Sequence, residues 1–307
     1  MIRHKKGLLR ASGHEVHGTE RFAFVLLPDF TLSAFAGAIE PLRLANRMSG
    51  DSLYEWRILS EAGATVTASC GAAIVPDGPL EEVDHHGTIV VVGGLNVKNA
   101  LSRPLLTWLR RESRHGAAMA AVCTGAEALA AAGLLTGKSC TIHWENRDGF
   151  EEEHPDIDLL PQIYVIDGQR YTAAGGMAST DLILKLISRT HGSDLANLVA
   201  DQLIYTTLRS DRDEQRLSIP ARIGIRHPRL ASIVAEMERN IEEPVSPSVL
   251  AAEVGMSTRQ LERLFRRYLN RSPKRYYMEV RLRRARNLLQ QTDMSVIEVA
   301  LACGFTS

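Results

Sequence analysis

Short apolar runs alternate with longer amphipathic segments over the first two thirds of the chain. The runs are rich in β-branched and aromatic residues and end in turn residues, which is typical of buried strands. They cover residues 22–27, 56–60, 88–92, 118–122 and 163–166. Apolar residues with helical spacing fill 33–48, 104–115, 126–132, 180–191 and 193–207. This repetition predicts an α/β fold with a doubly wound, mostly parallel sheet.

From about residue 228 the pattern is helical throughout. The polar stretch before it, 209–227, predicts a linker, so we expect an α/β domain over 21–208 and an all-α domain over 228–307. Residues 1–20 carry basic residues and histidines without an apolar run. They are therefore expected to form a disordered leader and not a signal peptide.

Two helix starts in the all-α part are marked by capping residues. Ser246-Pro247 predicts a helix that ends at Gly255, and Ser257 predicts the cap of the next. The second helix has an expected buried stripe of Leu261, Leu264, Phe265 and Tyr268. Its opposite face carries Arg259, Glu262, Arg263 and Arg266 at the same spacing. Such a two-faced helix is what reading of the DNA major groove requires.

A third helix is predicted to begin at Ser272-Pro273. The apolar residues that we expect it to bury are Met278, Leu282, Ala285 and Leu289.

The charge is unevenly distributed, although the whole chain has a net charge of zero. Between residues 257 and 290 there are eleven cations, ten of them arginine, against Glu262 and Glu279, which leaves +9. The alternative, a solvated helix face, would mix glutamate with arginine at i,i+4 spacing. A basic segment in an otherwise acidic chain points to nucleic acid.

An internal repeat accompanies this basic segment, because residues 250–258 align with 299–307 at an offset of 49. The phrases SPSVLAAEVGMSTRQLERLFRRYLNRSP and SVIEVALACGFTS resemble the AraC/XylS family. The resemblance implies two helix-turn-helix units joined by a long helix, with a second recognition helix beginning near Ser307. The expected DNA contacts are Ser257, Thr258, Arg259, Gln260, Glu262, Arg263, Arg266, Arg267 and Lys274.

A second motif begins where the predicted strand 118–122 runs into Cys123-Thr124-Gly125 and an alanine-rich helix. A thiol at such an elbow lies at a helix N-terminus, so we expect a lowered pKa and raised reactivity. Together with Gly93-Gly94, the segment resembles the class I glutamine amidotransferase-like (PfpI) superfamily over about residues 21–205. That resemblance implies that Glu40 approaches Cys123 and that His143 lies near the site.

Cys123 admits several interpretations. A catalytic nucleophile needs a base, but Thr124 stands where many PfpI hydrolases have histidine. Ala34 stands where isocyanide hydratase-like relatives have aspartate. We therefore expect a pocket without enzymatic activity. The alternatives are a hydrolase or hydratase that uses Cys123, a redox sensor, and an inert structural cysteine.

The combination of the two domains is similar to regulators that respond to arginine, glycine betaine or carnitine. For such effectors Glu40, Trp144 and Glu145 would face the cation, while amides at Cys123, Thr124 and Gly125 would hold the carboxylate. His143 is a further candidate contact. We expect promoter DNA, a small effector, RNA polymerase and a second copy in a homodimer as partners.

We expect neither a cofactor nor a metal, since His85-His86 and His14 to His17 lack further ligands at suitable spacing. No membrane span is expected, because no apolar run is long enough. The four cysteines lie far apart, which favours reduced thiols in the cytoplasm.

Overall fold

The computed structural model describes residues 18–207, 209–215 and 227–305. The chain divides into two compact units, 1–147 with 154–215, and 148–153 with 216–307. The expected linker began at residue 209, whereas the first unit extends to Gln215. Residues 1–17 of the expected leader lie outside the described residues, and Glu20 already belongs to the first strand. Among the described helices, none is both long enough and apolar enough to cross a membrane.

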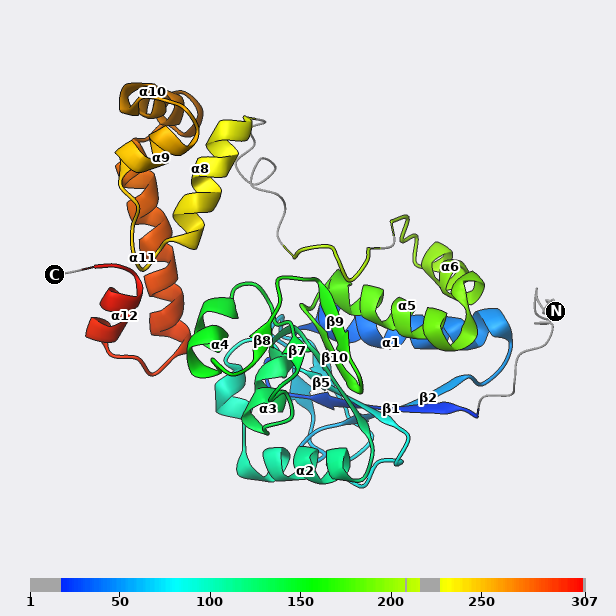
Figure 1. The fold of residues 1–307 in the computed structure, drawn as a ribbon. Helices are drawn as coiled ribbons and strands as arrows, with labels where there is room; N and C mark the ends of the chain where they lie inside the picture. Colours follow the sequence, from blue (N-terminus) through cyan, green and yellow to red (C-terminus); the bar gives the residue numbers. More distant parts are fainter. Residues whose placement is uncertain (1–17, 208, 216–226, 306–307) are drawn as a thin grey trace. The chain divides into compact units, whose positions relative to one another are not determined.

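The first unit is built on a six-stranded sheet with the order β2-β1-β5-β6-β10-β9 (Figure 1). Its strands are β1 (Glu20–Leu26), β2 (Tyr54–Leu59), β5 (Thr88–Val92), β6 (Ala118–Val122), β9 (Tyr164–Asp167) and β10 (Arg170–Ala173). All neighbours run parallel except β9, which is antiparallel to β10. The predicted α/β class and mostly parallel sheet are thus confirmed.

Helices cover both faces of this sheet. On one side lie α1 (Leu32–Ser49), α5 (Met177–His191) and α6 (Ser193–Gln202), and on the other α2 (Arg103–Arg114) and α3 (Ala126–Ala131) (Figure 1). The largest apolar core joins α1, α5 and α6 to the sheet. Burial of this apolar surface is the main contribution to the stability of the unit.

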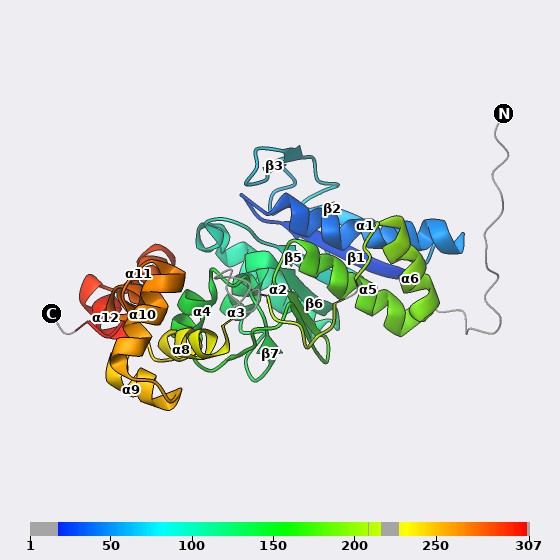
Figure 2. The same cartoon turned by 90° about the horizontal axis from the view of Figure 1, so that it is seen from above.

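Short elements complete the fold. The hairpin of β3 (Val66–Thr67) and β4 (Ala73–Ile74) stands beside the main sheet in Figure 2. The pair β7 (Ser139–Cys140) and β8 (Asp158–Leu159) is parallel. A 3-10 turn spans Val97–Ala100, and α4 spans Arg147–Glu153.

Two predictions about the first unit need correction. The helix expected over 193–207 ends at Gln202, because Ile204 takes a positive φ of 55° that a helix cannot contain. Strand β10 was not predicted. It follows a tight turn at Gly168 and begins Arg-Tyr-Thr, so it lacks the continuous apolar run by which β9, equally short, was predicted.

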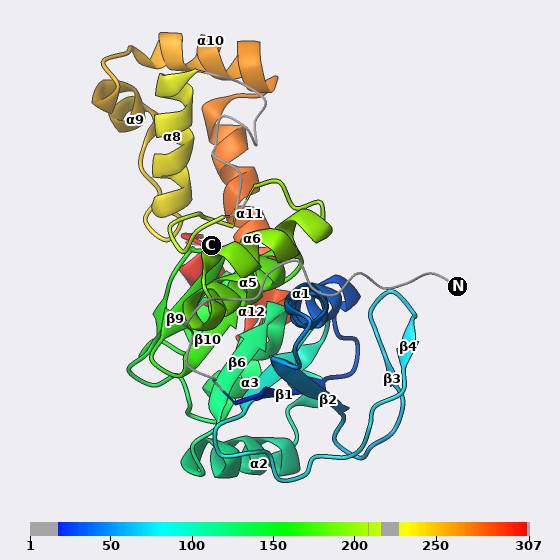
Figure 3. The same cartoon turned by 90° about the vertical axis from the view of Figure 1, so that its right-hand side faces the viewer.

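The second unit is a set of helices (Figure 3), and two separate apolar clusters form its interior. They are α8 (Pro228–Arg239), α9 (Pro247–Glu253), α10 (Thr258–Leu269), α11 (Pro273–Gln291) and α12 (Val296–Ala302). The predicted caps are present, since the hydroxyls of Ser246, Ser257 and Ser272 each accept a backbone N–H. Ser257 also forms a capping box with Gln260.

The internal repeat is visible in the backbone. Gly255 after α9 and Gly304 after α12 both have left-handed φ values, of 66° and 69°. A Cβ at Gly304 would lie 2.6 Å from the carbonyl oxygens of Ile241 and Glu242. Glycine is therefore required in this second turn for packing as well as for conformation.

The buried face of α11 differs from the predicted one. Met278, Leu282 and Leu289 are exposed and Ala285 is half-buried, whereas Tyr277, Val280 and Leu288 are buried. Relative to the prediction, the buried face of the helix is shifted by one residue, because Tyr277 and not Met278 packs into the core. The Tyr277 hydroxyl donates to the Asn240 carbonyl and accepts from the Val245 amide. A tyrosine with a satisfied hydroxyl buries more apolar area than methionine would.

This orientation of α11 can be measured. Tyr277→Ala should lower the unfolding free energy by about 3–5 kcal/mol, because it removes a buried ring. Met278→Ala should change it by less than about 1 kcal/mol, as for most exposed sites. Urea unfolding of the full chain, followed by circular dichroism, gives both values, and equal losses would contradict the assigned face.

Candidate functional site

The backbone turns sharply at Cys123, between β6 and α3. Cys123 has a φ of +59°, in the left-handed region, and begins a 3-10 turn over Cys123–Gly125. Such a conformation is unfavourable for a residue other than glycine, so the surroundings must hold it in place. The predicted strand-to-helix elbow is present.

Glycines hold the elbow by allowing close backbone approach. A Cβ on Gly93 would lie 2.4 Å from the Gly125 nitrogen, and one on Gly125 would lie 2.2 Å from the Val91 oxygen. A Cβ on Gly175, just before α5, would lie 2.7 Å from the Cys123 Cβ. The ends of β5, β6 and β10 therefore meet around the cysteine without room for further side chains.

The thiol itself is enclosed. Cys123 is 6% exposed, and its Sγ lies 3.4 Å from the Thr31 hydroxyl, with which it shares a hydrogen bond. Burial raises the pKa of the Cys123 thiol, while the bonds from Thr31 and the Thr124 backbone oppose that rise. The expected lowered pKa is thus wrong, since the desolvation of the buried thiol outweighs the hydrogen bonds that favour the thiolate.

Two residues of the expected site have other partners. The Glu40 carboxylate binds the Arg43 guanidinium on the same helix, at 2.5 and 2.9 Å. Among the described residues, Glu40 pairs with Arg43 and the Cys123 thiol bonds Thr31, so the implied approach of Glu40 to the thiol is not seen. The Thr124 hydroxyl donates to the Gly94 carbonyl at 2.7 Å and braces the elbow. Thr31, which does reach the thiol, was not singled out from the sequence.

The segment after β7 brings the other predicted residues together. The His143 ring lies 5.7 Å from the Trp144 ring, and its Nδ1 lies 3.8 Å from the Glu145 carboxylate. Burial lowers the pKa of His143, which favours the neutral ring. The charge of Glu145 is one cause of the raised pKa of Cys123, so this carboxylate acts on the thiol electrostatically. Trp144 is 38% exposed.

The predicted recognition helix is α10. Leu261, Leu264 and Phe265 are buried and Tyr268 is half-buried, as predicted. All nine candidate DNA-contact residues are exposed: Ser257, Thr258, Arg259, Gln260, Glu262, Arg263, Arg266, Arg267 and Lys274. The side chains of Ser257 and Gln260 are engaged in the capping box, so the arginines are the main candidates for base edges and phosphates.

Not every cation of the basic segment is available for DNA. Arg271 and Arg275 pair with Glu279. Arg281 donates to the carbonyls of Cys303 and Gly304, at 2.8 and 2.6 Å, and lies over the Phe305 ring. Arg281 therefore caps α12 and has a structural role.

A groove of about 930 Å³ lies along β1, β2 and residues 81–85. Its charged walls are paired, as Arg21 binds Asp84 and Arg57 binds Glu81. None of the predicted site residues lines it.

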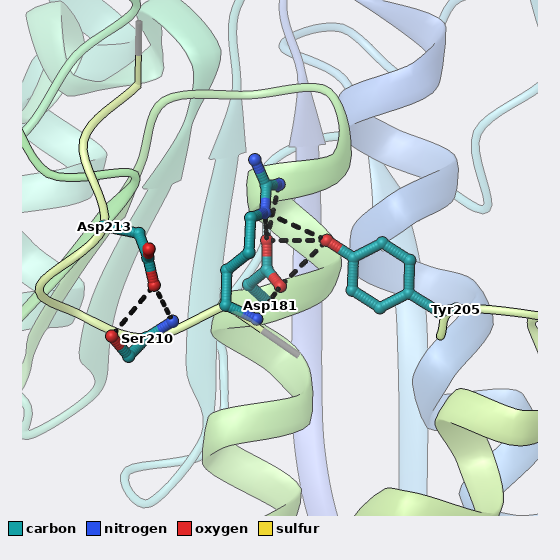
Figure 4. Close-up of polar contacts among 5 residues, drawn as sticks. Asp181, Tyr205, Ser210 and Asp213 are labelled. Atoms are coloured by element: carbon teal, nitrogen blue, oxygen red, sulfur yellow. Dashed lines mark hydrogen bonds and ion pairs between the residues drawn. The ribbon is translucent and has the colours of Figure 1, made fainter. Parts of the chain in front are cut away.

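Two buried carboxylates were missed from the sequence. Glu127 on α3 lies 3.2 Å from the His154 ring. Asp181 on α5, 2% exposed, binds Tyr205 and Arg209 (Figure 4). Burial raises the pKa of Asp181, and the Arg209 charge opposes that rise. Their partners lie 24 to 28 residues away in sequence, so no local motif reveals them.

These two units define a DJ-1/PfpI-type α/β domain followed by a helix-turn-helix domain. The DJ-1/PfpI family matches residues 33–189, and the helix-turn-helix domain family matches residues 250–307. The solved AraC family transcriptional regulator from Pseudomonas putida is 32% identical, with a TM-score of 0.55, over 60% of this chain and 99% of that one.

The chain belongs to the AraC-type helix-turn-helix transcriptional regulators that carry a DJ-1/PfpI domain. The HTH-type transcriptional regulator GbdR of Pseudomonas aeruginosa is 44% identical over 94% of this chain and 78% of its own length. The regulator CdhR of the same organism is 43% identical over 94% and 86%. Isonitrile hydratase of Pseudomonas putida, at 34%, matches only 46% of this chain. The relatives that match most of this chain are thus transcriptional regulators, whereas the hydratase matches less than half of it.

The protonation of Cys123 can be tested against an internal standard, because Cys70 is exposed. At neutral pH the raised pKa keeps Cys123 as the thiol, which is the poor nucleophile. Its alkylation by iodoacetamide should be slower than that of the exposed Cys70, and its rate should still rise with pH above about 8.5, the pKa of a free cysteine. Peptide mass spectrometry resolves the two sites. A titration midpoint for Cys123 at or below the free-cysteine value would contradict the raised pKa.

Proposed function

We propose that the α/β domain senses a small amino-acid-like metabolite of the arginine, glycine betaine or carnitine class. The single observation that carries this proposal is the grouping of His143, Trp144 and Glu145 near a buried thiol. An aromatic face and a carboxylate are the groups that bind a guanidinium or quaternary ammonium. The carboxylate of the ligand would meet the amides of Cys123, Thr124 and Gly125.

The chemistry at Cys123 supports sensing over turnover. The thiol is buried and its pKa is raised, so it is protonated at neutral pH. Thr31 and Thr124, its polar neighbours, are hydroxyls that do not act as general bases at this pH. Residues with this chemistry suit contact with a ligand but do not activate the sulfur.

The DNA-binding part acts on promoter DNA in the cytoplasm, with α10 in the major groove. A homodimer fits this role, since C2 symmetry matches paired half-sites. In such an assembly the effector would change transcription, as an activator, through contact with RNA polymerase.

Effector binding should raise the melting temperature of the full chain. At a hundredfold excess over Kd the stabilisation is about 2.7 kcal/mol. Trp144→Ala should abolish most of the shift produced by glycine betaine, carnitine or arginine, whereas Trp144→Phe retains part of it through the remaining ring. Glu61→Gln, at an exposed turn outside the predicted site, is the control and should leave the shift unchanged. Unchanged shifts in Trp144→Ala would place the ligand elsewhere.

Loss of one arginine from α10 should weaken specific DNA binding. Arg263→Ala is expected to cost about 1–3 kcal/mol, because a base-edge or phosphate contact disappears. Arg229→Ala removes the same charge from an exposed position on α8 and should have a smaller effect. The measurement is a binding isotherm at fixed salt, on a promoter fragment selected by the full-length protein. Equal affinities for the two variants would show that α10 does not read the DNA.

A further inference from the structure

Residues 209–215, which we call the strap, lie along the first unit as an added edge segment. The Ile163 amide donates to the Asp213 carbonyl at 2.9 Å, and the Gln215 amide donates to the Pro161 carbonyl at 3.1 Å. Glu214 and Gln162 form an antiparallel bridge there. The strap thus pairs with the backbone just before β9 and directly precedes the chain that leads to the second unit.

A buried ionic clamp fixes the first end of the strap (Figure 4). The Arg209 guanidinium donates to an Asp181 oxygen at 2.6 and 3.0 Å, and the Arg209 amide donates to the other oxygen. The Tyr205 hydroxyl donates to the same carboxylate at 2.9 Å. Within the strap, Asp213 accepts from the Ser210 amide and hydroxyl and closes a turn.

The other end is held by Gln215. Its Nε2 donates to the Ile142 carbonyl and the Thr141 hydroxyl, both at 2.8 Å, and to the Gln162 carbonyl at 3.1 Å. Ile142 directly precedes His143, the first residue of the proposed effector contact. Gln215 therefore binds the residue that directly precedes the proposed sensing segment, His143 to Glu145.

The two ends differ in strength. At the first end every oxygen of the buried Asp181 carboxylate has a partner. At the second end the side-chain oxygens of Gln162 and Gln215 are buried without a hydrogen bond among the described residues. A buried, unsatisfied acceptor opposes the ordered state. This imbalance favours opening at the Gln215 end.

We propose that the strap is a regulatory fastening whose Gln215 end is released when an effector moves Ile142. This inference rests on the proposed sensing function. Release would lengthen the tether to the DNA-binding unit, since seven extended residues reach up to about 23–25 Å. A ligand that binds the two states differently shifts their populations and so changes the freedom of the DNA-binding unit.

Variants that release the strap test the proposed regulatory role without any effector. Gln215→Ala and Arg209→Ala remove its two fastenings, and Glu214→Ala and Arg212→Ala are matched controls with exposed side chains. In the full chain, amide exchange of Ile163 and Gln215 should accelerate by about tenfold or more in the first pair only. Basal output from a promoter reporter should change by about fivefold or more, in one direction, in both opened variants.

The outcomes test the role of the strap and the sensing function separately. Two results would contradict the proposed regulatory role of the strap. One is rapid amide exchange with a reporter output equal to that of the controls, and the other is unchanged amide exchange in Gln215→Ala. If Arg209→Ala fails to fold because Asp181 loses its partner, Gln215→Ala decides alone. Addition of glycine betaine, carnitine or arginine should accelerate Gln215 exchange in the parent protein. A lack of any melting shift with these compounds would count against the sensing function, while the comparison of variants still decides the strap.

Discussion

The left-handed backbone at Cys123 is the constraint around which the α/β domain is arranged. A non-glycine residue keeps this conformation only where its neighbours leave no alternative, and here they do so by contact. Gly93 and Gly125 let two strand ends touch, and Gly175 lets the start of α5 approach the cysteine. The elbow thereby gathers Thr31, the end of β6 and the loop after β10 at the carboxyl edge of the sheet, where ligands of open α/β folds bind. The position of the residues proposed to contact an effector follows from this packing.

Much of the fold could be predicted because its patterns are local. The strands 88–92 and 118–122 are continuous apolar runs, and the structure has them with the same bounds. Helix starts were recognisable because Ser257 and Ser272 carry their capping chemistry in sequence. Strand β10 was missed, since its sequence Arg-Tyr-Thr-Ala contains no continuous apolar run, and the face of α11 was misplaced. There Met278 and Leu282 suggested a stripe, but the neighbouring Tyr277 fills the core.

Part of the candidate site rests on local motifs. Cys123, His143, Trp144 and Glu145 were singled out from the sequence and stay predictions, whereas Thr31 lies 92 residues from Cys123 and no spacing rule connects them. The same holds for Asp181 and Arg209, whose pairing depends on how α5 packs. The direction of the thiol pKa was also misjudged, because the sequence shows a helix start but not the depth of burial. Electrostatics inside a fold depends on solvent exclusion, which only the packed structure reveals.

The position of Arg281 affects how strongly the DNA affinity of this protein depends on salt concentration. Its guanidinium is occupied by the carbonyls after α12, and Arg271 and Arg275 share a carboxylate. Counterions are released from DNA only by cations that neutralise phosphates, each contributing about −0.9 to the slope of log K against log salt. The basic segment therefore displaces fewer ions than its eleven charges suggest. Its affinity is correspondingly less sensitive to ionic strength than its composition implies.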